Sequence, residues 1–207
     1  SGVAGDVLKL ILNQYTNIDA EVRKTYNLTK TQIAARPFCL FISYSGNTEE
    51  TISAAKNAID ENLEWAAISS GGELLDLATK HNKKFVKVPD GLQPRAAFGL
   101  MTKAVVNYLP NQTKKIFINA CEEAGNYLNN LTEDASNEVF EISKDIANQI
   151  GSKTAVIYAG SDLTYLVAQR WKTQINENSK SKAYVGFMPE VHHNEILSWE
   201  ADQEGSK

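Results

Sequence analysis

Short apolar runs alternate with amphipathic segments along most of this sequence. The runs are four to six residues long, which suits buried strands. They lie at 38–42, 65–68, 85–88, 154–159 and 183–187. Most precede a segment with apolar residues at helical spacing, such as Ile52, Ala55 and Ile59. A weaker strand is expected near 20–26. Alternating strands and helices joined by short polar loops predict an α/β fold in which helices flank parallel sheets.

The pattern of strands and helices occurs twice. The first copy ends before a helical stretch at 111–150, which a polar break at 132–136 divides into two helices. The pattern then restarts with a strand. We therefore expect one domain at 1–131 and a second domain at 132–207. The second copy has only two strands, too few for a stable sheet, so we expect this domain to be incomplete in the present sequence.

The start of the sequence also leads us to expect a longer polypeptide. Ser1 and Gly2 pass directly into an amphipathic helix that carries Val3, Val7 and Leu10 on one face. In an α/β fold, a helix that opens in this way normally follows a strand. We expect that strand to lie upstream of the first residue.

The loop after the run at 38–42 carries the clearest chemical signal. Ser43, Ser45 and Thr48 lie between that strand and the next helix. The loop should therefore lie across a helix N-terminus, where backbone N–H groups and the helix dipole attract anions. The loop lacks the lysine of a nucleotide-binding P-loop, so we expect a site for a single phosphate. The alternative is that Ser45, Asn47 or Thr48 merely caps the helix.

Two further loops follow the next two strands, at 69–72 and 90–95. In a parallel sheet, such loops converge with the first loop at the carboxyl edge, where ligands bind. Arg95 is the strong cation of this group and is expected to open a helix that runs to about residue 109. Its guanidinium could bind a phosphate or stabilise a negatively charged oxygen. A solvated surface arginine is an equally good interpretation.

The segment after the last strand contains a candidate base. Residues 188–194 form a polar loop that leads into an apolar helix, and Glu195 lies at that junction beside His192 and His193. A partly desolvated carboxylate in such a place could act as a general base. The alternative is a glutamate that only complements the helix dipole. Each histidine on its own is expected to be a hydrogen-bonding residue of the loop.

Charge and composition narrow the range of partners. The 21 basic and 25 acidic residues leave a net charge of −4 without long blocks of like charge, which argues against nucleic acid and membrane surfaces. Neither a membrane span nor a signal-peptide pattern is visible, so we expect a cytoplasmic protein. Cys39 and Cys121 lack metal-ligand spacing and only 3 histidines are present, so we expect no metal and no cofactor.

Five sequence motifs occur in one order. They are SYSGNTEET at 43–51, SSGG at 69–72, QPRAA at 93–97, QRWKTQINENSKSKA at 169–183 and HHNEILSWE at 192–200. Together they resemble the sugar isomerase (SIS) fold and, within it, the bifunctional phosphoglucose/phosphomannose isomerases of archaea and some bacteria. The resemblance covers nearly the whole chain. It implies two SIS-type subdomains, each a parallel sheet between helical layers, with the second subdomain incomplete here.

The resemblance also implies roles for individual residues. The SxSxxT loop of the family holds the substrate phosphate, which places Ser43, Ser45 and Thr48 on it. A serine of the family's first Gly-Gly-Ser loop matches Ser1. The arginine of QPRAA, here Arg95, stabilises an enediolate, and the glutamate of HNE, here Glu195, carries a proton between carbons 1 and 2. The family works as a homodimer with shared active sites.

Two functional residues of the family have no match in this sequence. The family opens the sugar ring with a histidine from across the dimer interface and also uses a lysine near its C-terminus. We expect both beyond Lys207; otherwise His193 would have to substitute in ring opening. The threonine that is linked to the acceptance of mannose is also expected beyond Lys207. Dual specificity for glucose and mannose is therefore an inference from overall similarity.

Three functions are therefore considered. The leading hypothesis is a metal-free aldose–ketose isomerase that acts on glucose 6-phosphate, and on mannose 6-phosphate, through a cis-enediol. A non-catalytic SIS module that binds a phosphosugar for regulation would need the loop at 43–48 but would not use Glu195 with Arg95. An amidotransferase-linked glucosamine 6-phosphate isomerase would bring an amine-handling domain that this sequence does not show.

Overall fold

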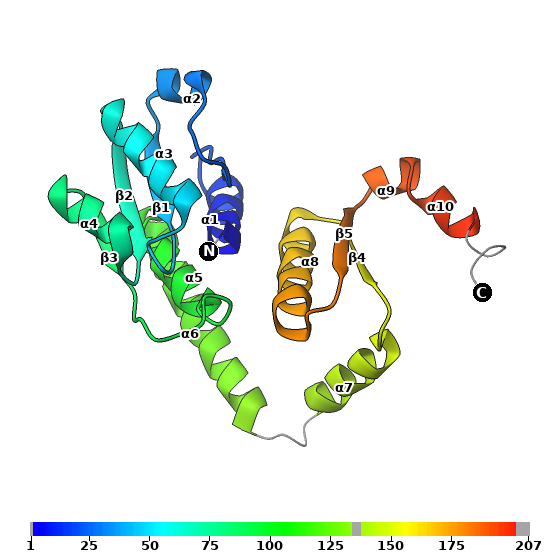
Figure 1. Ribbon diagram of the computed structural model, residues 1–207. Helices are drawn as coiled ribbons and strands as arrows, with labels where there is room; N and C mark the ends of the chain where they lie inside the picture. Colours follow the sequence, from blue (N-terminus) through cyan, green and yellow to red (C-terminus); the bar gives the residue numbers. More distant parts are fainter. Residues whose placement is uncertain (1, 134–137, 202–207) are drawn as a thin grey trace. The chain divides into compact units, whose positions relative to one another are not determined.

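The computed structural model describes residues 2–133 and 138–201, and the chain divides into two compact units (Figure 1). The first unit comprises Ser1–Glu123 and the second comprises Ala124–Lys207. The predicted domain boundary after residue 131 stays a prediction.

The first unit contains a parallel sheet in the order β1-β2-β3. Its helices are α1 (Gly2–Tyr15), α2 (Lys30–Ala35), α3 (Glu49–Asp60), α4 (Gly72–Lys80), α5 (Phe98–Val106) and the start of α6 (Asn111–Glu133), and its strands are β1 (Phe38–Ile42), β2 (Glu64–Ser69) and β3 (Lys84–Lys87). The strands predicted at 38–42, 65–68 and 85–88 are therefore present, the third displaced by one residue. Cα partners such as Phe41 and Ala67 set the register between β1 and β2.

Helices cover both faces of this sheet. Because side chains alternate along a strand, Phe41 and Trp65 point to one face, where they pack with α3 and α4. Ile42 and Ile68 point to the other face, where they pack with α1 and α5. Ile68 is 0% exposed and Trp65 is 2% exposed. The first unit is thus a three-layer αβα structure with a continuous apolar core on each side of the sheet.

The prediction of a strand near 20–26 is wrong. The segment is irregular, and its charged side chains are exposed. It is held at the surface by an ion pair between Lys24 and Asp6 (2.7 Å). The chain then forms α2, which the sequence reading missed, with a capping box between Thr29 and Gln32. That T-x-x-Q spacing was the signal that could have revealed the helix.

The second unit contains a two-stranded parallel sheet. Its elements are the rest of α6, then α7 (Glu138–Ile150), β4 (Ala155–Ala159), α8 (Asp162–Gln174), the π-helix η1 (Ile175–Ser179), β5 (Ala183–Phe187), α9 (Glu190–His193) and α10 (Ile196–Ala201). Both strands agree with the prediction. Helix α8 packs on one face of the sheet, where Tyr165 meets Phe187 edge to face at 5.2 Å.

The core of the second unit is small. Of its described residues, the buried apolar ones are Ala159, Ala168, Ala183 and Val191. Within the described residues, no helix of either unit is both long and apolar enough to cross a membrane.

Candidate functional site

The loop after β1 is built around Ser43. This side chain is 0% exposed, and its Oγ lies 2.8 Å from Oγ1 of Thr48 and accepts a hydrogen bond from the backbone N–H of Gly46 at 3.1 Å. The backbone N–H of Ser43 donates to Ile68 O in β2. Ser45 and Thr48, in contrast, are exposed. Of the three residues predicted to hold phosphate, two are therefore open to a ligand, while Ser43 supports the loop from beneath.

The hydroxyl groups of this loop do not cap α3. Thr48 occupies the N-cap position but makes no side-chain cap hydrogen bond. Asn47 instead accepts a hydrogen bond from Glu73 N in α4 at 3.0 Å, and Ser45 accepts one from Asn47 N at 3.2 Å. The simple capping alternative is therefore not what the structure forms. The N-terminus of α3 faces the loop with its helix dipole, an arrangement suited to an anion.

Gly46 is required where the first loop meets the second. Its φ is +71°, and a Cβ on this residue would overlap the carbonyl oxygen of Gly71. The carbonyl oxygen of Gly46 accepts a hydrogen bond from Leu74 N at 3.0 Å. The two loops are thus joined backbone to backbone, and only glycine permits this approach.

Tyr44 joins the loops that follow β1, β2 and β3, and the sequence reading missed it. Its hydroxyl donates to Pro89 O at 3.1 Å and accepts from Leu92 N at 3.0 Å. Its carbonyl oxygen accepts from the backbone N–H of Ser70 (2.9 Å) and from the Ser70 hydroxyl (2.7 Å). The side chain is only 5% exposed. The available signal was an aromatic residue in the middle of a loop of small polar residues.

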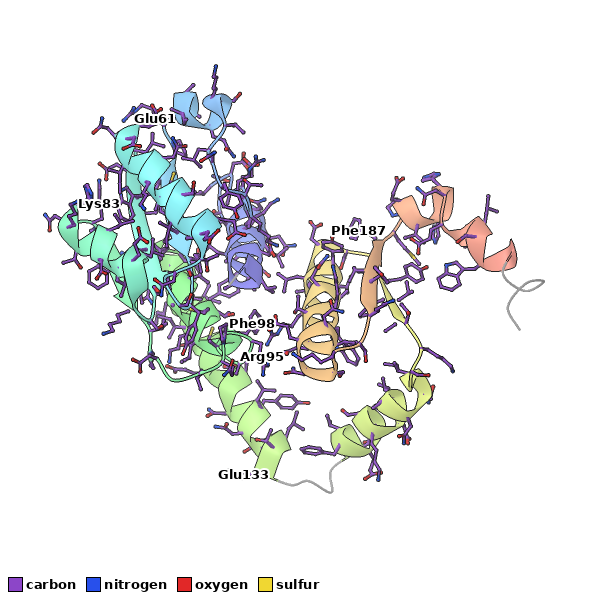
Figure 2. The ribbon with its side chains drawn as sticks, in the orientation of Figure 1. Glu61, Lys83, Arg95, Phe98, Glu133 and Phe187 are labelled. Carbon is purple, nitrogen blue, oxygen red and sulfur yellow. The ribbon has the colours of Figure 1, made fainter. Side chains whose placement is uncertain are left out.

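Arg95 lies in the third of these loops. It does not open the helix as predicted, because residues 94–97 form a turn and α5 begins at Phe98. The turn is closed by hydrogen bonds from Ala96 N to Gln93 O (2.8 Å) and from Ala97 N to Pro94 O (3.3 Å). Arg95 is half-buried, and Figure 2 labels it beside the start of α5. The parallel topology brings this loop and the loop at 43–48 to the same edge of the sheet.

In the second unit, Glu195 lies between α9 and α10. The carboxylate is half-buried, and Oε1 accepts a hydrogen bond from the Tyr158 hydroxyl at 2.7 Å. Tyr158 lies on β4, and its oxygen accepts a hydrogen bond from Nε1 of Trp199 in α10, also at 2.7 Å. Loss of hydration and the hydrogen bond to Glu195 raise the pKa of Tyr158, so the phenol stays protonated as a donor. The sequence reading missed both Tyr158 and Trp199.

The predicted site residues are divided between the two units. His193 ends α9 and is exposed. Ser1 lies outside the described residues. Ser43, Ser45, Thr48 and Arg95 belong to the first unit, and His193 and Glu195 to the second. Among the described residues, no group of three or more His, Cys, Asp or Glu side chains could hold a metal ion.

Comparisons with known proteins show a family and several relatives that this chain resembles. Residues 141–207 match the family described as the bacterial phospho-glucose isomerase C-terminal SIS domain. The chain is 37% identical to the bifunctional phosphoglucose/phosphomannose isomerase of Aquifex aeolicus, over 96% of this chain and 59% of that protein. It is 32% identical to the D-glucosamine-6-phosphate 4-epimerase of Sulfolobus acidocaldarius, over 98% of this chain and 62% of that protein.

Solved structures share the fold at low sequence identity. Tagatose-6-phosphate ketose/aldose isomerase from Escherichia coli aligns with a TM-score of 0.67 and 15% identity, over 95% of this chain and 56% of that chain. The alignment shows a shared fold and confirms the predicted α/β fold with helices flanking parallel sheets.

Nearly the whole chain is similar to several bifunctional phosphoglucose/phosphomannose isomerases, and its C-terminal part matches an SIS domain, so the resemblance drawn from the motifs is confirmed. The chain spans 59% and 62% of the length of the two curated relatives named above.

Proposed function

We propose that the polypeptide carrying this sequence is an aldose–ketose isomerase that interconverts glucose 6-phosphate, and mannose 6-phosphate, with fructose 6-phosphate. The observation that supports this most strongly is 37% identity, over 96% of the chain, with a bifunctional phosphoglucose/phosphomannose isomerase. The arrangement within each unit is compatible with this chemistry. The first unit offers hydroxyl groups and a cation at one edge of its sheet, and the second offers a hydrogen-bonded carboxylate.

In this proposal the first unit binds the phosphate of the substrate. Ser45 and Thr48 donate hydroxyl hydrogen bonds to its oxygens, and the N-terminus of α3 adds its dipole. Ser43 belongs to the same loop and keeps it in shape through its bond to Thr48. Ser1 is a further candidate from the motif. The remote phosphate supplies binding energy that orients the reacting carbons, although it does not itself react.

Glu195 is the proposed base. It takes the proton from carbon 2 of the open-chain aldose, and the electron pair of the broken C–H bond forms the enediolate while the carbonyl electrons move onto oxygen 1. Arg95 stabilises that oxygen. Glu195 returns the proton to carbon 1, and the hydroxyl proton of oxygen 2 moves to oxygen 1, which leaves the ketose. His193 is the candidate for ring opening that this sequence offers.

We also propose that the protein acts in the cytoplasm as a homodimer with shared active sites. The homodimer comes from the family resemblance that the motifs carry, and not from any contact in the structure. Analytical ultracentrifugation of the full-length polypeptide should give twice the mass of one chain, and a monomeric mass at full activity would overturn it.

The test of the proposed function is a matched pair of glutamate variants in the full-length polypeptide. Glu195→Gln keeps the shape of the side chain but removes the base, so we expect turnover to fall about 1,000-fold or more with little change in phosphosugar binding. Glu190→Gln is the control, because the side chain of this exposed residue bonds only Asn194 among the described residues. It should keep wild-type turnover.

The assay follows solvent-deuterium exchange at carbon 2 of glucose 6-phosphate and at carbon 1 of fructose 6-phosphate. Exchange that needs Glu195 supports the isomerase. Binding of the phosphosugar without exchange would favour the regulatory module instead.

The epimerase relative supports a second candidate reaction, inversion at carbon 4 of D-glucosamine 6-phosphate. Incubation with that sugar, followed by nuclear magnetic resonance of the product, separates the two activities. A carbon-4 epimer formed without any ketose would replace the proposed isomerase by an epimerase.

A further inference from the structure

A chain of two hydrogen bonds, both donated in the direction of Glu195, ends on its carboxylate. Nε1 of Trp199 donates to the Tyr158 hydroxyl, and that hydroxyl donates to Oε1 of Glu195, each over 2.7 Å. We propose that Tyr158 is the positioning residue of the base: it commits Oε1 of Glu195 as an acceptor, so that Oε2 alone carries the proton between carbons 1 and 2. This inference rests on the proposed function.

The direction of the chain follows from the chemistry of its first member. An indole N–H can only donate a hydrogen bond. Trp199 therefore occupies an acceptor position on the Tyr158 oxygen, and the single hydroxyl hydrogen of Tyr158 is left to point at Glu195. An ionised carboxylate can only accept, so the three groups fit together in one sense only. A proton on Oε1 would face the Tyr158 hydroxyl hydrogen and break the chain.

The ring of Tyr158 lies against Gly186 on the neighbouring strand. Tyr158 on β4 is the register partner of Gly186 on β5. A Cβ on Gly186 would lie 2.6 Å from Cε1 of Tyr158 and 2.8 Å from Cγ2 of Val191. Only a residue without a side chain lets the ring lie against β5 beside Val191, which is 5% exposed. Three elements thus determine where the hydroxyl points. The ring belongs to β4 and lies against β5, and α10 supplies the donor, Nε1 of Trp199.

With Oε1 engaged by Tyr158, the proton is carried by Oε2. In the forward reaction the bond from carbon 2 to its hydrogen breaks as the bond from that hydrogen to Oε2 forms, and the same proton then moves from Oε2 to carbon 1. With Oε1 occupied, the carboxyl group has little freedom to rotate, and Oε2 stays directed at the substrate. Pre-organisation of this kind is worth about 10- to 100-fold in rate when a reacting group would otherwise be misplaced by about 1 Å.

The experiment removes the hydroxyl of Tyr158 and keeps its ring. For Tyr158→Phe in the full-length polypeptide we expect kcat to fall about 10- to 100-fold and KM to stay within about 2-fold, because phosphate binding is untouched. The control is Tyr184→Phe. Tyr184 lies on the same face of the sheet, is 57% exposed, and its hydroxyl makes no hydrogen bond among the described residues. It should keep wild-type kcat.

A second readout follows the proton itself. Glucose 6-phosphate labelled with deuterium at carbon 2 is converted in ordinary water, and the fraction of label that reaches carbon 1 of the ketose is measured. A base held in one orientation returns more label than a base that rotates and exchanges with water. Tyr158→Phe should lower that fraction, and a merely structural role would not. An unchanged kcat or an unchanged fraction overturns the proposal.

Failure of this inference is distinct from failure of the proposed function. If Glu195→Gln is inactive and Tyr158→Phe is fully active, the isomerase stands and the positioning role is wrong. If Glu195→Gln keeps its activity, the assignment of Glu195 as the base is wrong, and the positioning role falls with it. If the wild type binds the phosphosugar without exchange, the proposed function itself is wrong. If Tyr158→Phe does not fold, Trp199→Phe decides, because it removes only the outer donor. A kcat about 3-fold or more lower at unchanged KM supports the proposal, and an unchanged kcat contradicts it.

Discussion

The two units hold their candidate residues in different ways. In the first unit, the loops after β1, β2 and β3 are joined by backbone contacts at Gly46 and by the buried side chain of Tyr44. In the second unit, Glu195 accepts one side-chain hydrogen bond from Tyr158, whose hydroxyl in turn accepts one from Trp199, on the exposed face of a two-stranded sheet. A phosphate loop only has to keep its shape, whereas a base has to point in one direction. Backbone packing serves the first need, and directed donors serve the second.

The largest effect is expected from a side chain placed between the two loops that meet at Gly46 and Gly71. Gly46→Ala should lower the free energy of unfolding of the first unit by about 4 kcal/mol, since a left-handed backbone and an overlap with Gly71 O both oppose it. Urea unfolding followed by Trp65 fluorescence, with the other two tryptophans changed to phenylalanine, measures the loss.

Gly91→Ala is the matched control for that experiment. Gly91 also has positive φ (+86°), but nothing lies within 4 Å of a Cβ built on it. The cost should therefore be limited to backbone strain of about 1–2 kcal/mol. Equal losses for the two variants would show that the loops do not depend on close contact at Gly46.

The second prediction compares the two cores. Ile68 is 0% exposed in the first unit, so Ile68→Ala should lower the free energy of unfolding of that unit by about 3 kcal/mol. Ile157 on β4 is only half-buried, and Ile157→Ala should cost the second unit about 1 kcal/mol. Hydrogen exchange of the strand amides reports each unit separately. A larger loss in the second unit would contradict the difference in core depth.

The third prediction concerns Tyr44. Tyr44→Phe leaves Pro89 O and Leu92 N without their hydroxyl partner, which should cost about 1.5 kcal/mol and release the loop that carries Arg95. The Leu92 amide should exchange faster with solvent, whereas amides within β2 should not change. Tyr15→Phe, at a residue that is 63% exposed, is the control. If the Leu92 amide exchanges as slowly in the Tyr44 variant as in the wild type, the loop is held by other contacts.

The smallest effect is expected from pH. Loss of hydration and the bond to Glu195 raise the pKa of Tyr158, so the folded state holds this proton more tightly than the unfolded state. The resulting stability is fully present below the ordinary tyrosine pKa of about 10 and is lost as pH rises through the raised value. Near-ultraviolet absorbance of the wild type minus Tyr158→Phe should show one phenol that titrates late. A titration at the ordinary value would argue against the bond.

Strongly periodic segments of the fold could be predicted from the sequence. The apolar runs at 38–42 and 183–187 are strands as expected, since a run of that length bounded by polar loops has few other ways to be buried. The strand expected near 20–26 failed because its charged residues find surface partners instead of a neighbouring strand. The cap at Thr29 was a readable signal that was overlooked.

The candidate site could be predicted only in part. Residue types and their order indicate an anion loop, a cation and a carboxylate, because each of these can be recognised in a few consecutive residues. They could not show that Ser43 is buried while Ser45 and Thr48 are open, since burial depends on what the next strand contributes.

By itself, the sequence determined the class of fold, the loop at 43–48 and the candidate residues Arg95 and Glu195, because local periodicity and short motifs encode these features. Only the tertiary structure decided which groups hold them. Tyr44 reaches Pro89 across 45 residues of sequence, and Tyr158 reaches Glu195 across 37. No local pattern reports such a pair, because the partners meet only after parallel strands bring the ends of separate segments to one edge of a sheet.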